Sequence, residues 1–139
     1  MYINYPAKFP QRLIDFTEFA INKLGLHRFK DKIVSIEYVK NVEGYFYGLA
    51  HGDKEICVIE IARYLGDQQI TWDERMSTIA HELVHARQYF RGDLTDDSNG
   101  NTVWMKRVYP TRTSYRKAPW EVEASRLEEE VLTAYKRHQ

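Results

Sequence analysis

The sequence predicts a single domain, residues 1–139, of the mixed α+β class. Two periodicities lead to this prediction: apolar residues recur every three or four positions in three segments, and every second position in a fourth region. The predicted order is one helix, three strands and two further helices, at residues 10–24, 33–62, 71–91 and 119–137. With 139 residues, 43% of them hydrophobic, the chain is long enough to bury one core.

The first helix and the strands follow from local patterns. Pro10 suits a first helical turn, Gly25 suits the position just past the end, and the apolar positions between them have helical spacing: Leu13, Phe16, Ala20 and Leu24. From Ile33 the period changes to two, and turn residues separate three predicted strands at 33–38, 45–50 and 55–62. Short connections favour hairpins, so we expect a three-stranded antiparallel sheet.

The helix predicted over residues 71–91 carries the most informative motif of the chain, His81-Glu82-Leu83-Val84-His85. Thr71 and Glu74 match a capping box at its start, and Gly92 suits its end. Residues four positions apart lie on the same helix face, so the two imidazoles can bind one zinc ion at distances of about 2.0–2.1 Å. Glu82 is turned roughly 100° away, which suits contact with a metal-bound water.

The amphipathic pattern of this helix leaves two interpretations open. Its apolar stripe can pack on the sheet: Met76, Ile79, Leu83, Ala86 and Phe90. The histidines fall on the opposite side, where they can line a cleft or simply belong to a solvent-exposed face.

A third metal ligand has to come from elsewhere, because a catalytic zinc usually keeps three protein ligands. The metzincin pattern is excluded, since Gln88 and Arg91 stand where it requires glycine and histidine. Met105 stands where a thermolysin-like spacing would place a glutamate, and the only downstream histidine is His138, next to the C-terminus.

The remaining candidates are carboxylates. The aspartates at 93, 96 and 97 lie in a turn-rich stretch, and the run 128–130 is most simply a solvated helix face. Glu121 and Glu123 lie in the first turn of the last helix, where acids also compensate the helix dipole. Helical position alone does not separate Glu121 from Glu123.

The connector over residues 102–118 is aromatic and basic, and we predict it to be irregular. A connection of this length is uncommon unless it serves a function such as a lid or the wall of a cleft. Four of its side chains are candidates to stabilise an oxyanion, of which we favour Tyr115: Tyr109, Arg112, Tyr115 and Arg116.

Taken together, His81-Glu82-x-x-His85 and a later helix bearing Glu121-x-x-Ala124 resemble the gluzincin metallopeptidases. Their third ligand is the first glutamate of an E-x-x-A or E-x-x-S segment. With the Trp/Tyr-rich connector and Pro119-Trp120-Glu121, residues 71–130 look like very small phage-associated and bacterial gluzincins. The resemblance implies a minimal zincin-like fold with one zinc ion per chain, held by His81, His85 and Glu121, and Glu82 as general base. Gluzincins often carry an aspartate four positions after the ligand glutamate to orient a histidine; here that residue is Ser125.

These observations predict a zinc metallopeptidase that hydrolyses peptide bonds of a peptide or protein substrate, with Glu82 and Tyr115 as catalytic residues. The strand at 55–62 could bind an extended peptide by edge pairing. Two alternatives are a non-catalytic zincin-fold module that binds a protein, and a nucleic-acid accessory protein that uses the basic connector 107–117.

The composition of the chain indicates its cellular compartment and limits the classes of partner that we expect. Lys plus Arg and Asp plus Glu both number 20, so the chain has no net positive charge that would indicate nucleic acid or an anionic membrane as a partner. The single Cys57 permits no internal disulfide and favours a reducing compartment. The sequence shows no signal-peptide pattern and no apolar run near the roughly 18 residues that span a bilayer. We therefore expect a cytoplasmic protein.

Overall fold

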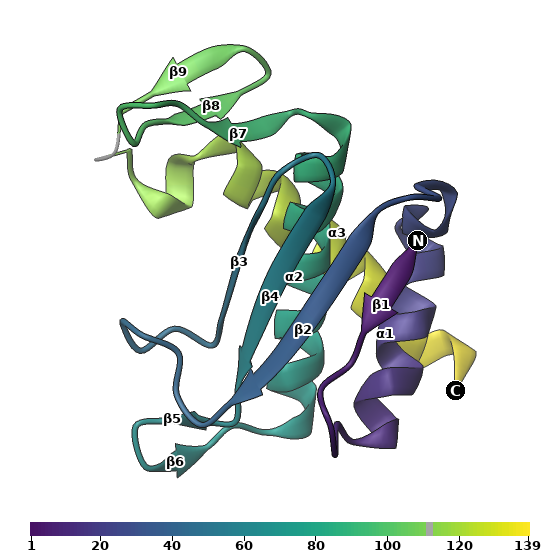
Figure 1. Ribbon diagram of the computed structural model, residues 1–139. Coiled ribbons are helices and arrows are strands. Elements are labelled where there is room, and N and C mark those ends of the chain that lie inside the picture. Colours follow the sequence, from purple (N-terminus) through teal and green to yellow (C-terminus); the bar gives the residue numbers. More distant parts are fainter. Residues whose placement is uncertain (111–112) are drawn as a thin grey trace.

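A four-stranded sheet with helices on one side forms the main body of the protein (Figure 1). The computed structural model describes residues 1–110 and 113–139. The mixed α+β class is confirmed. The sheet contains β1 (Tyr2–Asn4), β2 (Ile33–Val39), β3 (Gly48–Gly52) and β4 (Ile56–Ala62), and the helices behind it are α1 (Gln11–Lys23), α2 (Trp72–Arg91) and α3 (Pro119–His138).

The three helices begin and end close to the predicted positions, because their ends carry the expected local signals. The capping box of α2 is formed: the Thr71 hydroxyl accepts from the Glu74 backbone N–H at 3.1 Å, and the Glu74 carboxylate accepts from the Thr71 N–H at 3.4 Å. Gly92 ends α2 with a φ of 78°, a left-handed conformation that glycine adopts without strain. Pro119 occupies the first turn of α3.

The expected three-stranded antiparallel sheet is wrong. The strand order is β1-β2-β4-β3, with β1, β2 and β4 parallel and only β3 antiparallel to its neighbour. Residues 40–47 connect β2 to β3, but β4 lies between these two strands in the sheet, so β2 and β3 do not form a hairpin. The edge strand next to α2 is therefore β3, and the strand expected to pair with a peptide, β4, lies inside the sheet.

The connector also differs from the irregular segment that we expected. A small antiparallel sheet comprises β7 (Leu94–Asp96), β8 (Thr102–Trp104) and β9 (Arg107–Tyr109), followed by a 3-10 turn, Tyr115–Lys117. Strands of three residues are too short to show alternation. The β8–β9 turn also uses positive φ at Met105 and Lys106, 49° and 70°, where no glycine marks it.

Three shorter elements complete the chain: a 3-10 turn at Leu26–Arg28 and the small hairpin of β5 (Tyr64–Leu65) and β6 (Gln68–Gln69). Within the part of the chain that the structure describes, no helix has the length and apolar character needed to cross a lipid bilayer.

Helix α2 is buried on nearly all sides, since it packs against β3 and β4 on one side and against α3 and α1 on others. All five residues of its predicted apolar stripe are buried. The opposite side is buried too, with His81 and His85 only 9% and 6% exposed. The interpretation of this side as a solvent-exposed face is therefore wrong.

The close approach of β3 to α2 depends on Gly48. A Cβ atom at this position would overlap Thr78 Cγ2 and would lie 3.4 Å from Glu82 Cγ. Thr78 lies one turn of α2 before Glu82, the second residue of the histidine motif. Only a residue without a side chain lets the edge strand lie this close to the helix.

We predict that Gly48→Ala lowers the free energy of unfolding by about 1–3 kcal/mol, because the added methyl group overpacks the β3–α2 contact. Urea denaturation followed by circular dichroism measures this change. Thr78→Ala in the same chain removes the obstructing methyl group, so the double variant should regain part of the loss. Equal stability of wild type and Gly48→Ala would contradict the close packing.

Candidate metal centre

Helices α2 and α3 bring His81, His85 and Glu121 together, although α3 lies about 40 residues further along the chain. Glu121 Oε1 lies 2.9 Å from His81 Nε2 and 3.1 Å from His85 Nε2. The three ligand atoms lie within 4.8 Å of one another, an arrangement that could hold a metal ion. Glu123, the other candidate for the third ligand, does not join these three residues. Its carboxylate accepts a hydrogen bond from Gln88 instead.

The outer nitrogen of each histidine, Nδ1, which faces away from Glu121, contacts a further side chain. His81 Nδ1 lies 2.8 Å from Glu128 Oε1, and His85 Nδ1 lies 2.7 Å from Gln88 Oε1. Sequence reasoning missed both groups. Glu128 follows Glu121 by two helical turns and so shares its face, and Gln88 follows His85 by about one turn; these spacings were the available signals. Ser125, which stands at the gluzincin aspartate position, is exposed instead.

The hydrogen bonds of Gln88 define the tautomer of His85. The Gln88 amide nitrogen donates to Trp120 O at 3.0 Å and to Glu123 Oε1 at 3.1 Å, so the amide oxygen must face the histidine. His85 Nδ1 therefore carries hydrogen, and a neutral imidazole would turn the bare lone pair of Nε2 toward the Glu121 carboxylate. Two lone pairs at this separation repel unless a proton or a metal cation lies between them.

The same argument applies to His81, whose Nδ1 faces the acceptor Glu128. Two imidazole nitrogens and one carboxylate oxygen are a donor set that zinc favours, and an acceptor on the outer nitrogen is the usual support of a ligand histidine. The residues present therefore fit a divalent metal ion.

The pKa shifts of the three side chains indicate that the cluster favours positive charge on its histidines. Burial opposes a charged His81, but hydrogen bonds to Glu121 and Glu128 outweigh it and raise the His81 pKa to about 10. For His85, burial again opposes the charge, while Glu121 and Glu82 raise the pKa. Burial disfavours the Glu121 carboxylate, yet the two histidines lower its pKa to about 2. One anionic oxygen thus stabilises a cation on both neighbours.

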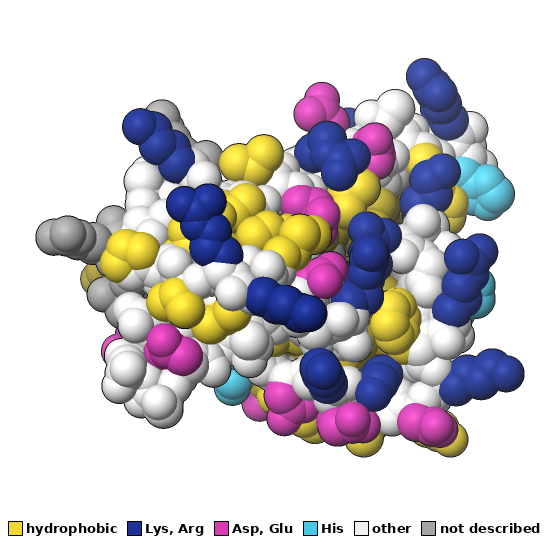
Figure 2. Space-filling view, turned by 90° about the horizontal axis from the view of Figure 1, so that it is seen from above, with side chains coloured by type: hydrophobic (Ala, Val, Ile, Leu, Met, Phe, Trp, Pro, Cys, Tyr) yellow, Lys and Arg dark blue, Asp and Glu magenta, His cyan; other side chains and the backbone are white. Residues whose placement is uncertain are grey.

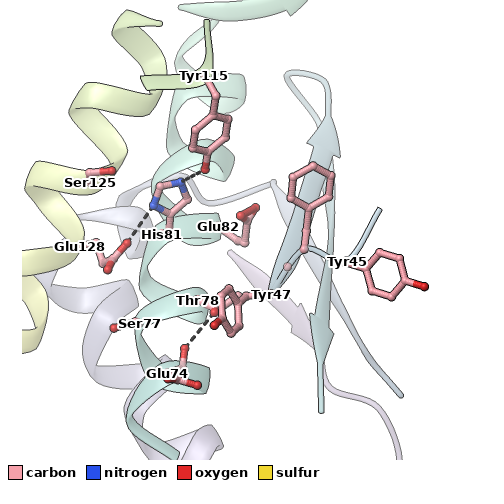
Figure 3. Close-up of a pocket in the computed structure, with 12 residues that line it drawn as sticks. Tyr45, Tyr47, Glu74, Ser77, Thr78, His81, Glu82, Tyr115, Ser125 and Glu128 are labelled. Atoms are coloured by element: carbon pink, nitrogen blue, oxygen red, sulfur yellow. Dashed lines mark hydrogen bonds and ion pairs between the residues drawn. The ribbon is translucent and has the colours of Figure 1, made fainter. Parts of the chain in front are cut away.

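Glu82 lies next to this cluster without joining it. Its side chain is only 6% exposed, and its Oε2 has no hydrogen-bond partner among the described residues. Burial raises the pKa of its carboxyl group, and the two histidines oppose the rise. A buried carboxylate without a partner is rare in folded proteins, so this group is a candidate to act on a ligand. Figure 3 shows it directed from α2 toward the side where Tyr45 and Tyr47 lie.

Of the connector residues that we considered, Tyr115 reaches the cluster. Its hydroxyl lies 3.3 Å from His81 Nε2 (Figure 3). Burial and the nearby Glu121 raise its pKa, so the phenol stays protonated and can donate. Tyr109 packs edge-on against the Trp120 ring, with centroids 5.3 Å apart. Arg112 and the side chain of Arg116 lie outside the described residues.

Two cavities meet at Glu82. The larger, about 540 Å³, runs along α2 past His81 toward Glu74. The smaller, about 290 Å³, lies against β3 and is lined by His85 and Glu121. Four residues line both, so they form one cleft across the cluster: Phe46, Gly48, Glu82 and Tyr115.

Comparisons of the chain with models of protein families, with curated proteins and with solved structures found no match.

We predict that Gln88→Leu lowers the free energy of unfolding of the metal-free protein by about 2–3 kcal/mol. The substitution leaves His85 Nδ1, Trp120 O and the Glu123 carboxylate without their partner in a buried contact. Urea denaturation in the presence of a chelator measures the loss. Gln68→Leu, at an exposed position, is the matched control and should change stability by less than about 0.5 kcal/mol. Equal effects of the two substitutions would exclude a structural role for the Gln88 hydrogen bonds.

Proposed function

We propose that this protein is a zinc-dependent metallopeptidase of the gluzincin type. The observation that carries the proposal is the pair of Nε2 atoms that face one carboxylate oxygen, with both outer nitrogens held by acceptors. His81, His85 and Glu121 would hold the zinc ion. Glu82, on the turn between the two histidines, would act beside it.

In the proposed peptide hydrolysis, Glu82 and Tyr115 of the cleft have separate roles. Zinc, when bound, supplies a Lewis acid that lowers the pKa of a water molecule to about 7. Glu82 takes a proton from the attacking water and passes it to the leaving amine, a role that suits a buried carboxylate with an unpartnered oxygen. Tyr115 donates its hydroxyl hydrogen to the oxyanion that develops on the peptide carbonyl.

The sheet edge supports a peptide as the substrate. β3 pairs with β4 on one side only, and its other edge borders the cleft through Gly48, Leu49 and Ala50. An extended peptide can pair with the free backbone groups of such an edge. An antiparallel edge strand beside a helix that carries the histidine motif supports a zincin-like arrangement, with β3 in the role that we had expected for residues 55–62.

We predict that the wild-type protein binds about one zinc ion per chain and that His81→Ala abolishes this binding, because two remaining ligands hold zinc poorly. Inductively coupled plasma mass spectrometry after dialysis measures the metal. His27→Ala, at an exposed histidine, is the control and should keep the zinc ion. A wild-type protein that takes up no zinc when refolded with it would end the metallopeptidase proposal.

We predict that Glu82→Gln keeps the zinc ion but lowers peptide hydrolysis by about 10²–10⁴-fold, since the amide cannot accept the proton. Cleavage of fluorescence-quenched peptides by zinc-loaded protein is the measurement. Unchanged hydrolysis would remove Glu82 from its assigned role. Zinc and peptide binding without any cleavage by the wild type would instead indicate a non-catalytic binding module.

We predict that Glu128→Gln weakens zinc binding by about 10–100-fold, because the charged acceptor that orients His81 is lost. Competition with a chromophoric chelator measures the affinity. Glu129→Gln makes the same change of charge at the next residue, which is exposed, and should leave the affinity within about twofold. Equal affinities of the two variants would show that Glu128 does not support the ligand.

A further inference from the structure

We propose that the larger cavity, between Glu82 and Glu74, is a specificity pocket that takes a lysine or arginine side chain of the substrate. The inference rests on the peptidase function proposed above and concerns which peptides are cleaved. It is carried by three properties of the cavity: its aromatic wall, its charge and its length.

The aromatic wall consists of three consecutive side chains, Tyr45, Phe46 and Tyr47, which are 76%, 54% and 44% exposed. They directly precede β3 and all line the cavity. Tyr45 has a φ of 59°, which is strained for a bulky residue, so the surrounding turn imposes this conformation. Large exposed aromatics that are gathered beside a cleft indicate a surface that contacts a ligand.

The charge of the cavity is acidic. Its described lining residues include no lysine or arginine, and His81 is the one basic side chain among them, at the end away from Glu74. Three glutamates line the cavity: Glu74, Glu82 and Glu128. Glu82 is also the buried side chain with an unpartnered oxygen. Glu128 uses Oε1 to contact His81, and Glu74 uses Oε2 in the capping box, so each retains a second oxygen. A cationic group is favoured in such a cavity, and an anionic one is repelled.

The length of the cavity favours a long side chain. Glu74 precedes His81 by seven residues, which is about 10 Å along the axis of α2. Figure 3 shows Glu74 at one end of the groove, with Tyr47 beside Thr78 between it and the histidine. A substrate held at the metal centre must therefore reach along the helix. The aliphatic stem of lysine or arginine can lie against the aromatic rings while its charged end meets the Glu74 carboxylate.

The face of the molecule seen from above carries hydrophobic, acidic and basic side chains together (Figure 2). No single sign of charge covers that face, and Lys plus Arg and Asp plus Glu both number 20 over the chain, so the acidic character of the pocket is local. Selection is then local and should respond to a change of one pocket residue.

The test uses zinc-loaded full-length protein and a peptide library made from a digested proteome, with cleavage sites identified by mass spectrometry. We expect lysine and arginine to be enriched at one position relative to the cleaved bond. Quenched peptides that carry arginine, norleucine or glutamate at that position then give kcat/KM for each. Glu74→Gln should lower kcat/KM for the arginine peptide about threefold to tenfold and leave the norleucine peptide unchanged.

Glutamine at position 74 still completes the capping box, so Glu74→Gln isolates the charge from the fold. Asp73→Asn is the matched control: it removes a neighbouring charge from the same turn but does not line the pocket, and it should keep the wild-type preference. Cleavage without enrichment of basic residues, or an unchanged ratio of arginine to norleucine in Glu74→Gln, overturns the pocket while the peptidase function stands. Failure to cleave any peptide overturns the peptidase function and, with it, the pocket.

Discussion

The contact between α2 and α3 depends on one carboxylate oxygen, Glu121 Oε1, which faces Nε2 of both His81 and His85. Charged groups are buried only when they are paired, so the two helices must meet in one register. A shift of α3 by one residue would rotate Glu121 by about 100° and remove the carboxylate oxygen that faces Nε2 of both histidines. The geometry of the candidate metal centre and the packing of the two longest helices therefore depend on each other.

The face of α3 that meets α2 shows how this constraint is satisfied. Four residues at helical spacing alternate between polar and apolar groups along it: Glu121, Ala124, Glu128 and Val131. Ala124 and Val131 are 0% and 1% exposed. The small side chain of Ala124 lets the helices approach between the two glutamates, which gives a physical reason for an alanine three positions after Glu121.

Local patterns were sufficient to predict the three helices and to place His81, Glu82 and His85, because helical periodicity and end signals act within a few residues. Glu121 required a resemblance, since its distinction from Glu123 depends on how α3 crosses α2. Glu128 resembled a solvated acid in sequence, and only the neighbouring helix makes it a partner of His81. The sheet order depends on which strand pairs with β2. That strand is β4 and not the next one along the chain, and connection lengths do not predict such a long-range pairing.

The position of β4 between β2 and β3 affects how the cleft is assembled. β3 and β4 form a hairpin whose turn is held by Asp53, and the pairing continues to Tyr47 through the Ala62 N–H. Such a local hairpin forms within microseconds, whereas the parallel pairing of β2 with β4 must close a longer loop. One side of the cleft is thus formed by β3 and the residues before it, and α2 and α3 contribute to the other side. The width of the cleft therefore depends on the distance between β3 and α2, which the close approach at Gly48 keeps short.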